Sequence, residues 1–350
     1  MSDRIAASDL RRFIARAFIA AGLPDADATV VADLMTEADL IGADAHGIFR
    51  LPQYVRRIEA GGVNKTPNIT VNRTAAATAL VDGDNGMGHL VMSRACETAI
   101  ELAKESGVGW VGVRRSNHAG PASLYAAMPM QAGMIGLYSA VASANHMAPW
   151  GGTDLLLGTN PLAIAIPTGT DTPLVLDIAT TVVSYGTIKN HVLQGKDFQP
   201  GWVIDRKDGS DLTDHTRSKD GVLLPIGGYK GAGLALMLGL LAGTLNGAGV
   251  GRAVVDFNAD DTTLSNTGQF VIALDIARFI DPAIFAAMAQ AHVQELRDSA
   301  LLPGITAIRL PGDERAKRVA DRTQNGVPMV LELQAVLNKL GARLGIGALT

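Results

Sequence analysis

A histidine and an arginine lie four residues apart in the segment Asp44-Ala45-His46-Gly47-Ile48-Phe49-Arg50. On a helix, residues at this spacing share a face. A guanidinium can hold a carboxylate through two parallel hydrogen bonds, and an imidazole can exchange a proton near neutral pH. The pair therefore suits a 2-oxo or 2-hydroxy acid, with Arg50 at the carboxylate and His46 at the C2 oxygen. The alternative is a histidine that caps a helix and an arginine that faces solvent.

A second histidine, His118, occurs in Ser116-Asn117-His118-Ala119-Gly120, between a predicted strand and a predicted helix. Polar side chains at such a junction often face a cleft. The alternative is that Ser116 or Asn117 caps the helix and that His118 is solvated.

Two further segments also follow predicted strands. The loop from Ser143 to Gly152 is small, kinked and polar, so it could approach a cofactor closely, or it could be an ordinary loop. The second segment is Asp177-Ile178-Ala179-Thr180-Thr181. Its aspartate could bind ribose hydroxyls or cap the next helix.

Two predicted helix starts could bind an anion. Gly227-Gly228-Tyr229-Lys230-Gly231 opens a long apolar helix, where backbone amides and a lysine would attract pyrophosphate or a carboxylate. Its glycines could instead serve packing. Pro311-Gly312-Asp313-Glu314-Arg315 also opens a helix, but its acids already suit the helix dipole.

One segment, from Gly107 to Gly112, matches the dinucleotide pattern G-x-G-x-x-G. That pattern binds pyrophosphate only after a strand and at the start of a helix. Here a helix precedes the match and a strand runs through it, so Gly107 is predicted to end the helix. If the protein binds NAD(P), it does so without an ordinary Rossmann unit.

Composition excludes several classes of protein. The 350 residues carry a net charge of −4 with no basic stripe, which argues against nucleic acid as a partner. No histidine or cysteine pattern has metal-ligand spacing, so no metal is expected. The single cysteine, Cys96, fits a reducing compartment, and the start of the sequence has no apolar signal stretch. We therefore expect a cytoplasmic protein without a membrane segment.

Periodicity predicts alternating helices and strands. Helices are expected at residues 8–22, from 25, and at 49–60, 92–105, 119–132, 229–245, 282–300 and 331–340, with one more after 311. Ser8 and Asp25 are the expected caps of the first two helices. Strands are expected at 69–82, 108–113, 135–141, 162–166, 174–178, 270–274 and 307–310. The polar stretch 194–220 is expected to be a surface excursion.

Taken together, these segments resemble the malate/L-lactate dehydrogenase family, whose fold differs from the Rossmann-type enzymes of similar name. The matching pieces include DAHGIFRLPQYVRRIEAGGVN, RRSNHAGPASLY, MAPWGGTDLLLGTNPLAIAIPT, LVLDIATTVVSYG, GGYKGAGLALML and LPGDERA, in order from about residue 40 to 315. The resemblance implies an α/β fold with a central mixed or largely antiparallel sheet and a helical domain built from both termini. We expect an N-terminal helical part (1–75), an NAD(P)-binding domain (76–255) and a C-terminal part (256–350) that packs with the N-terminal helices and at the dimer interface. A homodimer is also implied.

The resemblance also implies roles for individual residues. His46 or His118 would be the catalytic acid/base, and Arg50 would bind the substrate carboxylate. The implied contacts of NAD or NADP are Ser143, Asp177, Ile178, Ala179, Thr180, Tyr229, Lys230, Gly312, Asp313 and Glu314. The chain departs from the family pattern at Ala45, at Asp313 and at Asn145-His146. We hypothesise that His146 lines the site and tunes substrate choice.

The function implied is hydride transfer between NAD(P) and C2 of a small 2-hydroxy or 2-oxo acid. One alternative is a reductase of cyclic ketimines such as piperideine-2-carboxylate or pyrroline-2-carboxylate. The other alternative is a dimeric binding protein without catalysis.

Overall fold

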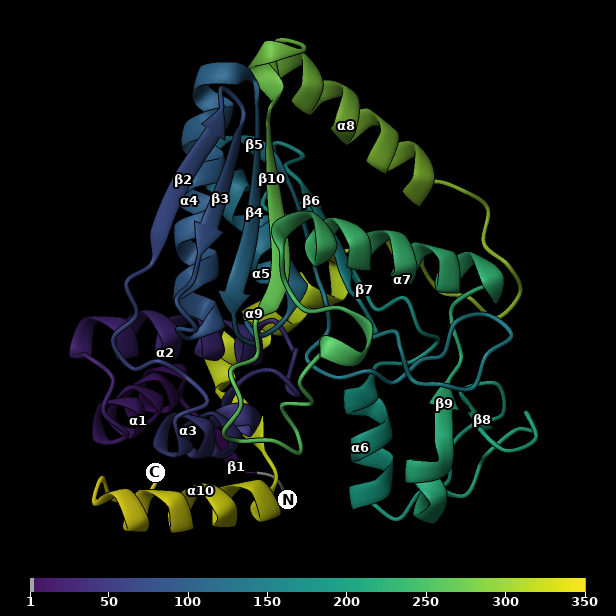
Figure 1. Ribbon diagram of the computed structural model, residues 1–350. Coiled ribbons are helices and arrows are strands. Elements are labelled where there is room, and N and C mark those ends of the chain that lie inside the picture. The colour runs from purple at the N-terminus through teal and green to yellow at the C-terminus, as the bar shows by residue number, and fades with distance from the viewer. Residues whose placement is uncertain (1–2, 350) are drawn as a thin grey trace.

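A seven-stranded sheet forms the centre of the protein, in a computed structural model that describes residues 3–349 (Figure 1). The strands lie in the order β2 (Thr70–Ala75), β3 (Thr78–Asp82), β4 (Val108–Ser116), β10 (Thr267–Asp275), β5 (Met134–Ala140), β6 (Leu162–Ile166) and β7 (Leu174–Ile178). Strands β3 and β4 are parallel, and all other neighbours in this sheet are antiparallel. The predicted mixed, largely antiparallel sheet is thereby confirmed.

Strand β10 comes from the last third of the chain but lies between β4 and β5. Its side chains alternate between the two faces, as the two-residue period of a strand requires. Val271 and Ala273 pack with helices α4 (Gly88–Ser106) and α5 (Ala122–Ala127). Phe270 instead packs with helix α7 (Tyr229–Ala242). Both faces of the sheet centre are therefore covered, which explains the apolar run in this strand.

The two ends of the chain share one hydrophobic core, as predicted. Helices α1 (Ala7–Ala20), α2 (Asp25–Leu40) and α3 (Leu51–Ala60) pack with α10 (Leu331–Leu344) below the sheet (Figure 1). Strand β1 (Asp3–Ile5) pairs with β11 (Val327–Met329) and ties the ends together. Helix α9 (Asp313–Asn325) connects this helical part to the sheet. It contacts α2 of the helical part.

The polar stretch predicted as a surface excursion has a small core of its own. Helix α6 (Tyr185–Leu193) packs against strands β8 (Val203–Asp205) and β9 (Gly221–Leu223), with Ile188, Phe198, Val203, Leu212 and Leu223 buried between them. Helix α8 (Pro282–Arg297) extends along the opposite end of the molecule and has no buried residue (Figure 1).

Several local predictions need correction. The strand expected at 307–310 does not form, because Pro311 and Gly312 turn the chain and the Pro311 carbonyl bonds to Val175 N of β7 instead. Helix α1 begins one residue before Ser8, and α2 begins at Asp25 itself, so neither side chain is the cap. Gly107 does end α4 in a left-handed conformation, as predicted. Within residues 3–349, no helix has the length and apolar character needed to cross a bilayer.

Candidate active site

One cavity of about 300 Å³ gathers side chains from segments far apart in the sequence. Strands β4 and β5 both run antiparallel to β10, and β5 and β7 both run antiparallel to β6, so the carboxyl ends of β4, β5 and β7 meet at one edge of the sheet. The start of β10 reaches the same edge and contributes Thr267 and Gln269. The cavity lies where this edge meets the helical part. The predicted site residues among its lining are His46, Arg50, His118, Ser143, His146, Asp177 and Ala179.

His46 lies in a tight turn before the predicted helix, so it does not share a helical face with Arg50. The turn leads into a short 3-10 helix, Ile48–Arg50, and then into α3. The buried carboxylate of Asp39 accepts a hydrogen bond of 2.8 Å from Ile48 N. A Cβ atom on Gly47 would lie 2.0 Å from Asp39 Oδ1, so only glycine fits between the turn and this carboxylate. Asp39 and Gly47 therefore set the position of His46.

The ring of His118 is held on several sides. The Tyr54 hydroxyl lies 2.5 Å from Nδ1, and Gly120 N donates to the same nitrogen at 3.3 Å. Phe257 stacks on the ring with centroids 4.8 Å apart, and His46 stacks at 5.4 Å. Because Nδ1 accepts the backbone N–H, the neutral ring carries its proton on Nε2. His118 is therefore an oriented donor at the cavity and not a solvated surface histidine.

Arg50 is almost fully buried yet bonds only to neutral oxygens in the described residues. Its Nε donates to Ala45 O at 2.8 Å, and Nη1 donates to Gln53 Oε1 at 2.9 Å. Gln53 in turn donates to Phe257 O at 2.6 Å, which fixes its orientation. A buried cation is costly without an anionic partner. Arg50 is thus a strong candidate for binding an anion in the cavity.

The positive charge of Arg50 also acts on the two histidines. Desolvation by the surrounding protein, followed by the charge of Arg50, lowers the pKa of His46 to about 3. Desolvation, with the charges of His46 and Arg50 as further causes, holds the pKa of His118 well below its ordinary value of 6.5. Both rings are therefore neutral at pH 7. An anion bound at Arg50 would raise both pKa values, because it cancels the charge that lowers them.

Another part of the cavity lining is aromatic, with a lysine behind it. The ring of His146 stacks on Tyr185, with centroids 3.5 Å apart and planes 14° apart. Lys189 follows Tyr185 by one helical turn and lies 5.3 Å from the centroid of its ring. Its Nζ donates to Asn258 Oδ1 at 2.6 Å, and Asn258 lines the cavity. Burial and the charge of Arg50 lower the pKa of Lys189 to about 8.

Asp177 lies at the end of β7 with its side chain exposed in the cavity. The dense protein around it raises its pKa, and hydrogen bonds from Ser123 oppose that rise. Ser123 N donates to its carboxylate at 2.8 Å, so Asp177 caps the start of α5, the helix that follows His118. Arg315 of α9 donates to Ser123 Oγ at 3.1 Å and links this corner to the helical part.

The other predicted cofactor contacts lie outside the cavity lining. Thr180 is buried and donates to Thr159 O, while Ile178 ends β7. Tyr229 and Lys230 begin α7 and are exposed. Gly312 lies against β7, where a Cβ would be 2.7 Å from Pro173 O. Asp313 accepts from Arg297 at 2.7 Å, and Glu314 pairs with Lys317 at 3.1 Å. Their cofactor roles stay predictions.

Five residues with clear places in the site were missed from the sequence: Tyr54, Tyr185, Lys189, Phe257 and Asn258. Tyr54 follows Arg50 by four positions, and this spacing could have revealed it. Lys189 has the same spacing from Tyr185, but Tyr185 was itself missed. Phe257 and Asn258 lie in an irregular segment that gives no periodic signal.

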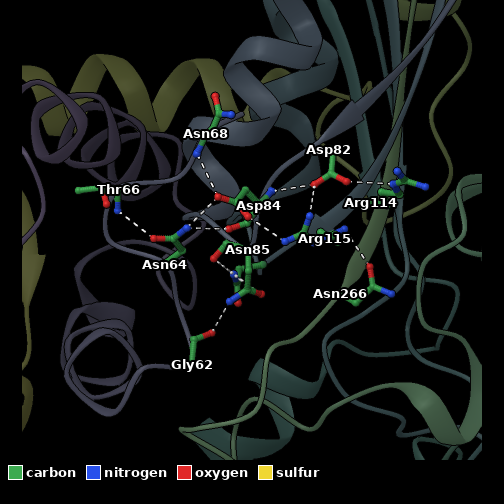
Figure 2. A network of polar contacts seen from close by, with 11 residues as sticks. Gly62, Asn64, Thr66, Asn68, Asp82, Asp84, Asn85, Arg114, Arg115 and Asn266 are labelled. Carbon is green, nitrogen blue, oxygen red and sulfur yellow. Dashed lines mark hydrogen bonds and ion pairs between the residues drawn. The ribbon is translucent and has the colours of Figure 1, made fainter. Parts of the chain in front are cut away.

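A polar network fixes the loop that carries His118 (Figure 2). The turn between β3 and α4 contains Asp84 and Asn85, both with positive φ, and Arg115 at the end of β4 also has a positive φ. Arg115 donates to both Asp82 and Asp84. Asn117 Nδ2 donates to Asn85 O at 3.0 Å. Such backbone conformations are costly and persist only when neighbouring bonds hold them, so the network is a rigid support for the adjacent histidine.

Folding also brings Asp197, Asp214 and His215 together, a grouping that the sequence spacing did not suggest. Asp197 is hydrogen-bonded to His215, and Asp214 caps the turn that follows it. These exposed carboxylates already have protein partners.

The fold and the site together define an α/β protein with an imidazole pair beside a buried guanidinium that has no acidic partner among the described residues. The family model described as malate/L-lactate dehydrogenase matches residues 5–338. The malate dehydrogenase of Pyrococcus horikoshii is 36% identical over 99% of this chain and 97% of its own length. Its solved structure superposes with a TM-score of 0.90 at 35% identity, covering 99% and 97% of the two chains. The chain therefore belongs to the malate/L-lactate dehydrogenase family and is an oxidoreductase that acts on CH–OH groups.

Other relatives carry different names. The ureidoglycolate dehydrogenase (NAD(+)) of Escherichia coli K12 is 30% identical over 95% of both chains. The (2R)-3-sulfolactate dehydrogenase (NADP(+)) of Chromohalobacter salexigens is 32% identical over 98% of both chains. A Δ1-piperideine-2-carboxylate reductase structure from Pseudomonas syringae pv. tomato superposes with a TM-score of 0.83 at 26% identity, covering 97% of this chain and 100% of its own. The family thus spans several substrates.

Proposed function

We propose that the protein transfers a hydride between NAD or NADP and C2 of a small 2-hydroxy or 2-oxo acid. The observation that carries this proposal is the meeting of His46, His118 and Arg50 in one cavity, with the guanidinium free of any carboxylate partner among the described residues. A carboxylate-bearing alcohol or ketone needs an acid–base group for its C2 oxygen and an anion-binding group for its carboxylate, and this cavity holds a candidate for each.

The cavity fits the nicotinamide end of the cofactor. Small side chains line its wall between His118 and Asp177, including Ala119, Gly120 and Ala122, and leave room for a flat ring. Gln269 lines the cavity, and its buried Oε1 has no protein partner, so it could accept a carboxamide N–H. Ser143, Asp177 and Ala179 would contact the rest of the cofactor. When bound, the nicotinamide accepts or supplies the hydride.

Within this site we assign proton transfer to His118. In the direction of reduction, an imidazole protonated in the presence of the anionic substrate would give its Nε2 proton to the C2 oxygen as negative charge develops there, and would return to its neutral form. The Tyr54 hydroxyl can donate or accept, so it can bond to Nδ1 in either protonation state of the ring. His46, stacked on the same ring, is the alternative proton donor.

Arg50 would hold the substrate carboxylate and set the distance of C2 from the histidines. Its contacts with Ala45 O and Gln53 Oε1 fix the plane of the guanidinium and leave the remaining N–H groups for a ligand. The bound carboxylate would also raise the pKa of His46, since Arg50 lowers it in the unliganded site.

A cyclic ketimine reductase remains the second candidate, because the same donor and guanidinium could serve a C=N bond beside a carboxylate. The likeness to the piperideine-2-carboxylate reductase structure favours it. The alternative of a binding protein without catalysis has no support, since the named relatives are dehydrogenases.

We further propose that two copies pair through α7. This helix exposes a row of apolar side chains, Leu236, Met237, Leu240 and Leu241, and an exposed apolar face of this kind marks an interface. A cytoplasmic location stays a prediction from the sequence.

The experiment is an assay of NADH and NADPH oxidation with pyruvate, oxaloacetate and piperideine-2-carboxylate. We expect turnover with at least one 2-oxo acid. His118→Asn should lower kcat by roughly a hundredfold or more while nucleotide binding, followed by fluorescence, stays intact. His46→Asn with the larger loss would transfer the acid/base role to His46. Turnover of the imine alone would favour the second candidate, and failure to bind either nucleotide would exclude both.

A further inference from the structure

Arg322 of α9 reaches the turn that carries His46. Its side chain is 11% exposed. Nη1 donates to Asp39 O and to Asp44 Oδ1, and Nη2 donates to Asp44 Oδ2 at 3.2 Å. A guanidinium and a carboxylate joined by two parallel bonds take one relative orientation. Arg322 therefore fixes the place of Asp44 relative to α9.

Asp44 begins a turn whose next two residues both belong to the site. Ala45 O accepts from Arg50 Nε at 2.8 Å, and this bond is one of the two that set the plane of the Arg50 guanidinium. The ring of His46 stacks on that of His118, with centroids 5.4 Å apart. Because nearly rigid peptide units join consecutive residues, a shift of Asp44 would move both Ala45 O and the ring of His46.

The surroundings of Arg322 are acidic, in contrast to those of Arg50. The hydrogen bond to Asp44 raises the pKa of Arg322, burial opposes that rise, and the charges of the surrounding carboxylates add to it. One of these carboxylates, Asp321, is paired with Arg4 at 3.0 Å. Arg322 thus has its counter-ion within the protein, and it does not line the cavity. It supports the site without contacting a ligand.

We propose that Arg322 is a positioning residue of the active site. Through Asp44 it holds the turn at residues 44–47, and with that turn the acceptor that orients Arg50 and the ring of His46. This inference rests on the proposed function, in which Arg50 binds the substrate carboxylate. An arginine that only docked α9 onto the helical part would affect stability and leave ligand binding by the folded protein unchanged.

The test uses two measurements on the full-length protein, neither of which needs turnover. Oxamate has a carboxylate beside a carbonyl group, as a 2-oxo acid does, and it is titrated by calorimetry in the presence of saturating NADH or NADPH. Histidine labelled with ¹³C at Cε1 gives the NMR signal of each imidazole, and His46→Asn identifies the signal of His46.

The variants separate the two roles of Arg322. Arg322→Met removes both bonds to Asp44 and keeps the length of the side chain, whereas Arg322→Lys keeps the charge but not the paired geometry. Asp44→Asn weakens the same pair from its other side. The matched control is Asp321→Asn, which breaks the ion pair with Arg4 on the same helix and does not touch the turn.

We expect Arg322→Met to weaken oxamate binding roughly tenfold or more, because a guanidinium without a fixed plane must be ordered when the ligand binds. The His46 signal should shift, since the ring moves relative to that of His118. Arg322→Lys and Asp44→Asn should show smaller changes of the same kind. Asp321→Asn should bind oxamate within about twofold of the wild type and leave the His46 signal in place, because exposed ion pairs contribute little.

In a protein that binds oxamate, an unchanged affinity in Arg322→Met would overturn the inference. Equal changes in Arg322→Met and Asp321→Asn would also overturn it, because the effect would then belong to the docking of α9. If the wild type does not bind oxamate, the proposed function is rejected and the His46 signal alone decides: a shift in Arg322→Met upholds the positioning role, and no shift overturns it. If Arg322→Met fails to fold, Asp44→Asn, altered at an exposed side chain, decides by the same measurements.

Discussion

The hydroxyl of Tyr54 and Nδ1 of His118 lie 2.5 Å apart, although 64 residues separate them in the chain. Helix α3 supplies the hydroxyl and the loop after β4 supplies the imidazole, so the helical part of the molecule orients the ring that we propose as the proton donor. Catalysis should therefore depend on how these two parts meet.

Replacement of Tyr54 by phenylalanine tests this dependence. The variant loses the bond that holds the ring and follows its tautomer, so kcat should fall by roughly tenfold to a hundredfold. Nucleotide binding should not change. Tyr125→Phe removes another buried hydroxyl, which bonds only to Ala119 O, and should lower stability with little effect on kcat. Equal kcat losses in the two variants would mean that the Tyr54 hydroxyl has only a structural role.

Arg50→Lys should mainly impair use of the acid substrate. A lysine cannot make two parallel bonds to a carboxylate, and it cannot keep both Ala45 O and Gln53 Oε1 as acceptors. We expect KM for the 2-oxo acid to rise by about tenfold or more. Arg56→Lys is the control, because Arg56 is exposed on α3, the helix that directly follows Arg50. Unchanged steady-state constants in Arg50→Lys would place the carboxylate elsewhere.

Gly47→Ala should disturb the turn that carries His46. The new Cβ would lie 2.0 Å from Asp39 Oδ1, so the turn or the carboxylate must move. Overpacking of this kind costs about 1–3 kcal/mol, and we expect a lower Tm together with reduced kcat. Glu101→Ala, at an exposed position in α4, should be neutral or slightly stabilising. Thermal unfolding and activity are measured on both variants. A Gly47→Ala variant with full activity would show that the turn tolerates the new Cβ without moving His46.

Asp39 should make stability depend on pH. Burial raises the pKa of this carboxyl from 3.8 to about 8 in the folded protein. Between these values the unfolded chain releases the proton and the folded chain retains it, so this contribution to stability is full below about pH 4 and declines as the pH rises to about 8.

Asp39→Asn keeps the acceptor for Ile48 N and removes the titration. Its free energy of unfolding, relative to that of the wild type, should therefore rise by at least about 1 kcal/mol between pH 5 and pH 8. Urea unfolding at several pH values measures this difference. Asp171→Asn, at an exposed position, should show no such trend. A constant difference across the range would mean that Asp39 is ionised in the folded protein.

Periodicity predicted most strands to within a few residues, because apolar runs such as Leu162–Ile166 are buried on one face, half-buried on the other and bounded by turns. It could not place β10 between β4 and β5, since pairing between distant strands leaves no local pattern. Nor could it find the β1–β11 pair, because each strand has only three residues. The turn that carries His46 was not predicted, because Asp39 holds it through a contact that sequence spacing does not encode.

For the site, spacing identified His46 and Arg50 as partners, the place between a predicted strand and a predicted helix indicated His118, and the departure from the family pattern indicated His146. All four line one cavity. Tyr185 and Lys189 were missed because no helix was predicted at residues 185–193, and Phe257 because its segment has no regular structure. Contacts across the cavity depend on the tertiary fold, which residue types alone do not specify.

The place of β10 has a consequence for how the protein emerges from the ribosome. Strands β4 and β5 are made early, but neither pairs with the other, and the gap between them closes only when residues 267–275 have left the exit tunnel. Until then both strands keep an open edge of the sort that promotes aggregation. More than three quarters of the polypeptide must therefore be translated before the sheet can complete, and we expect nascent chains stopped short of this strand to rely on chaperones.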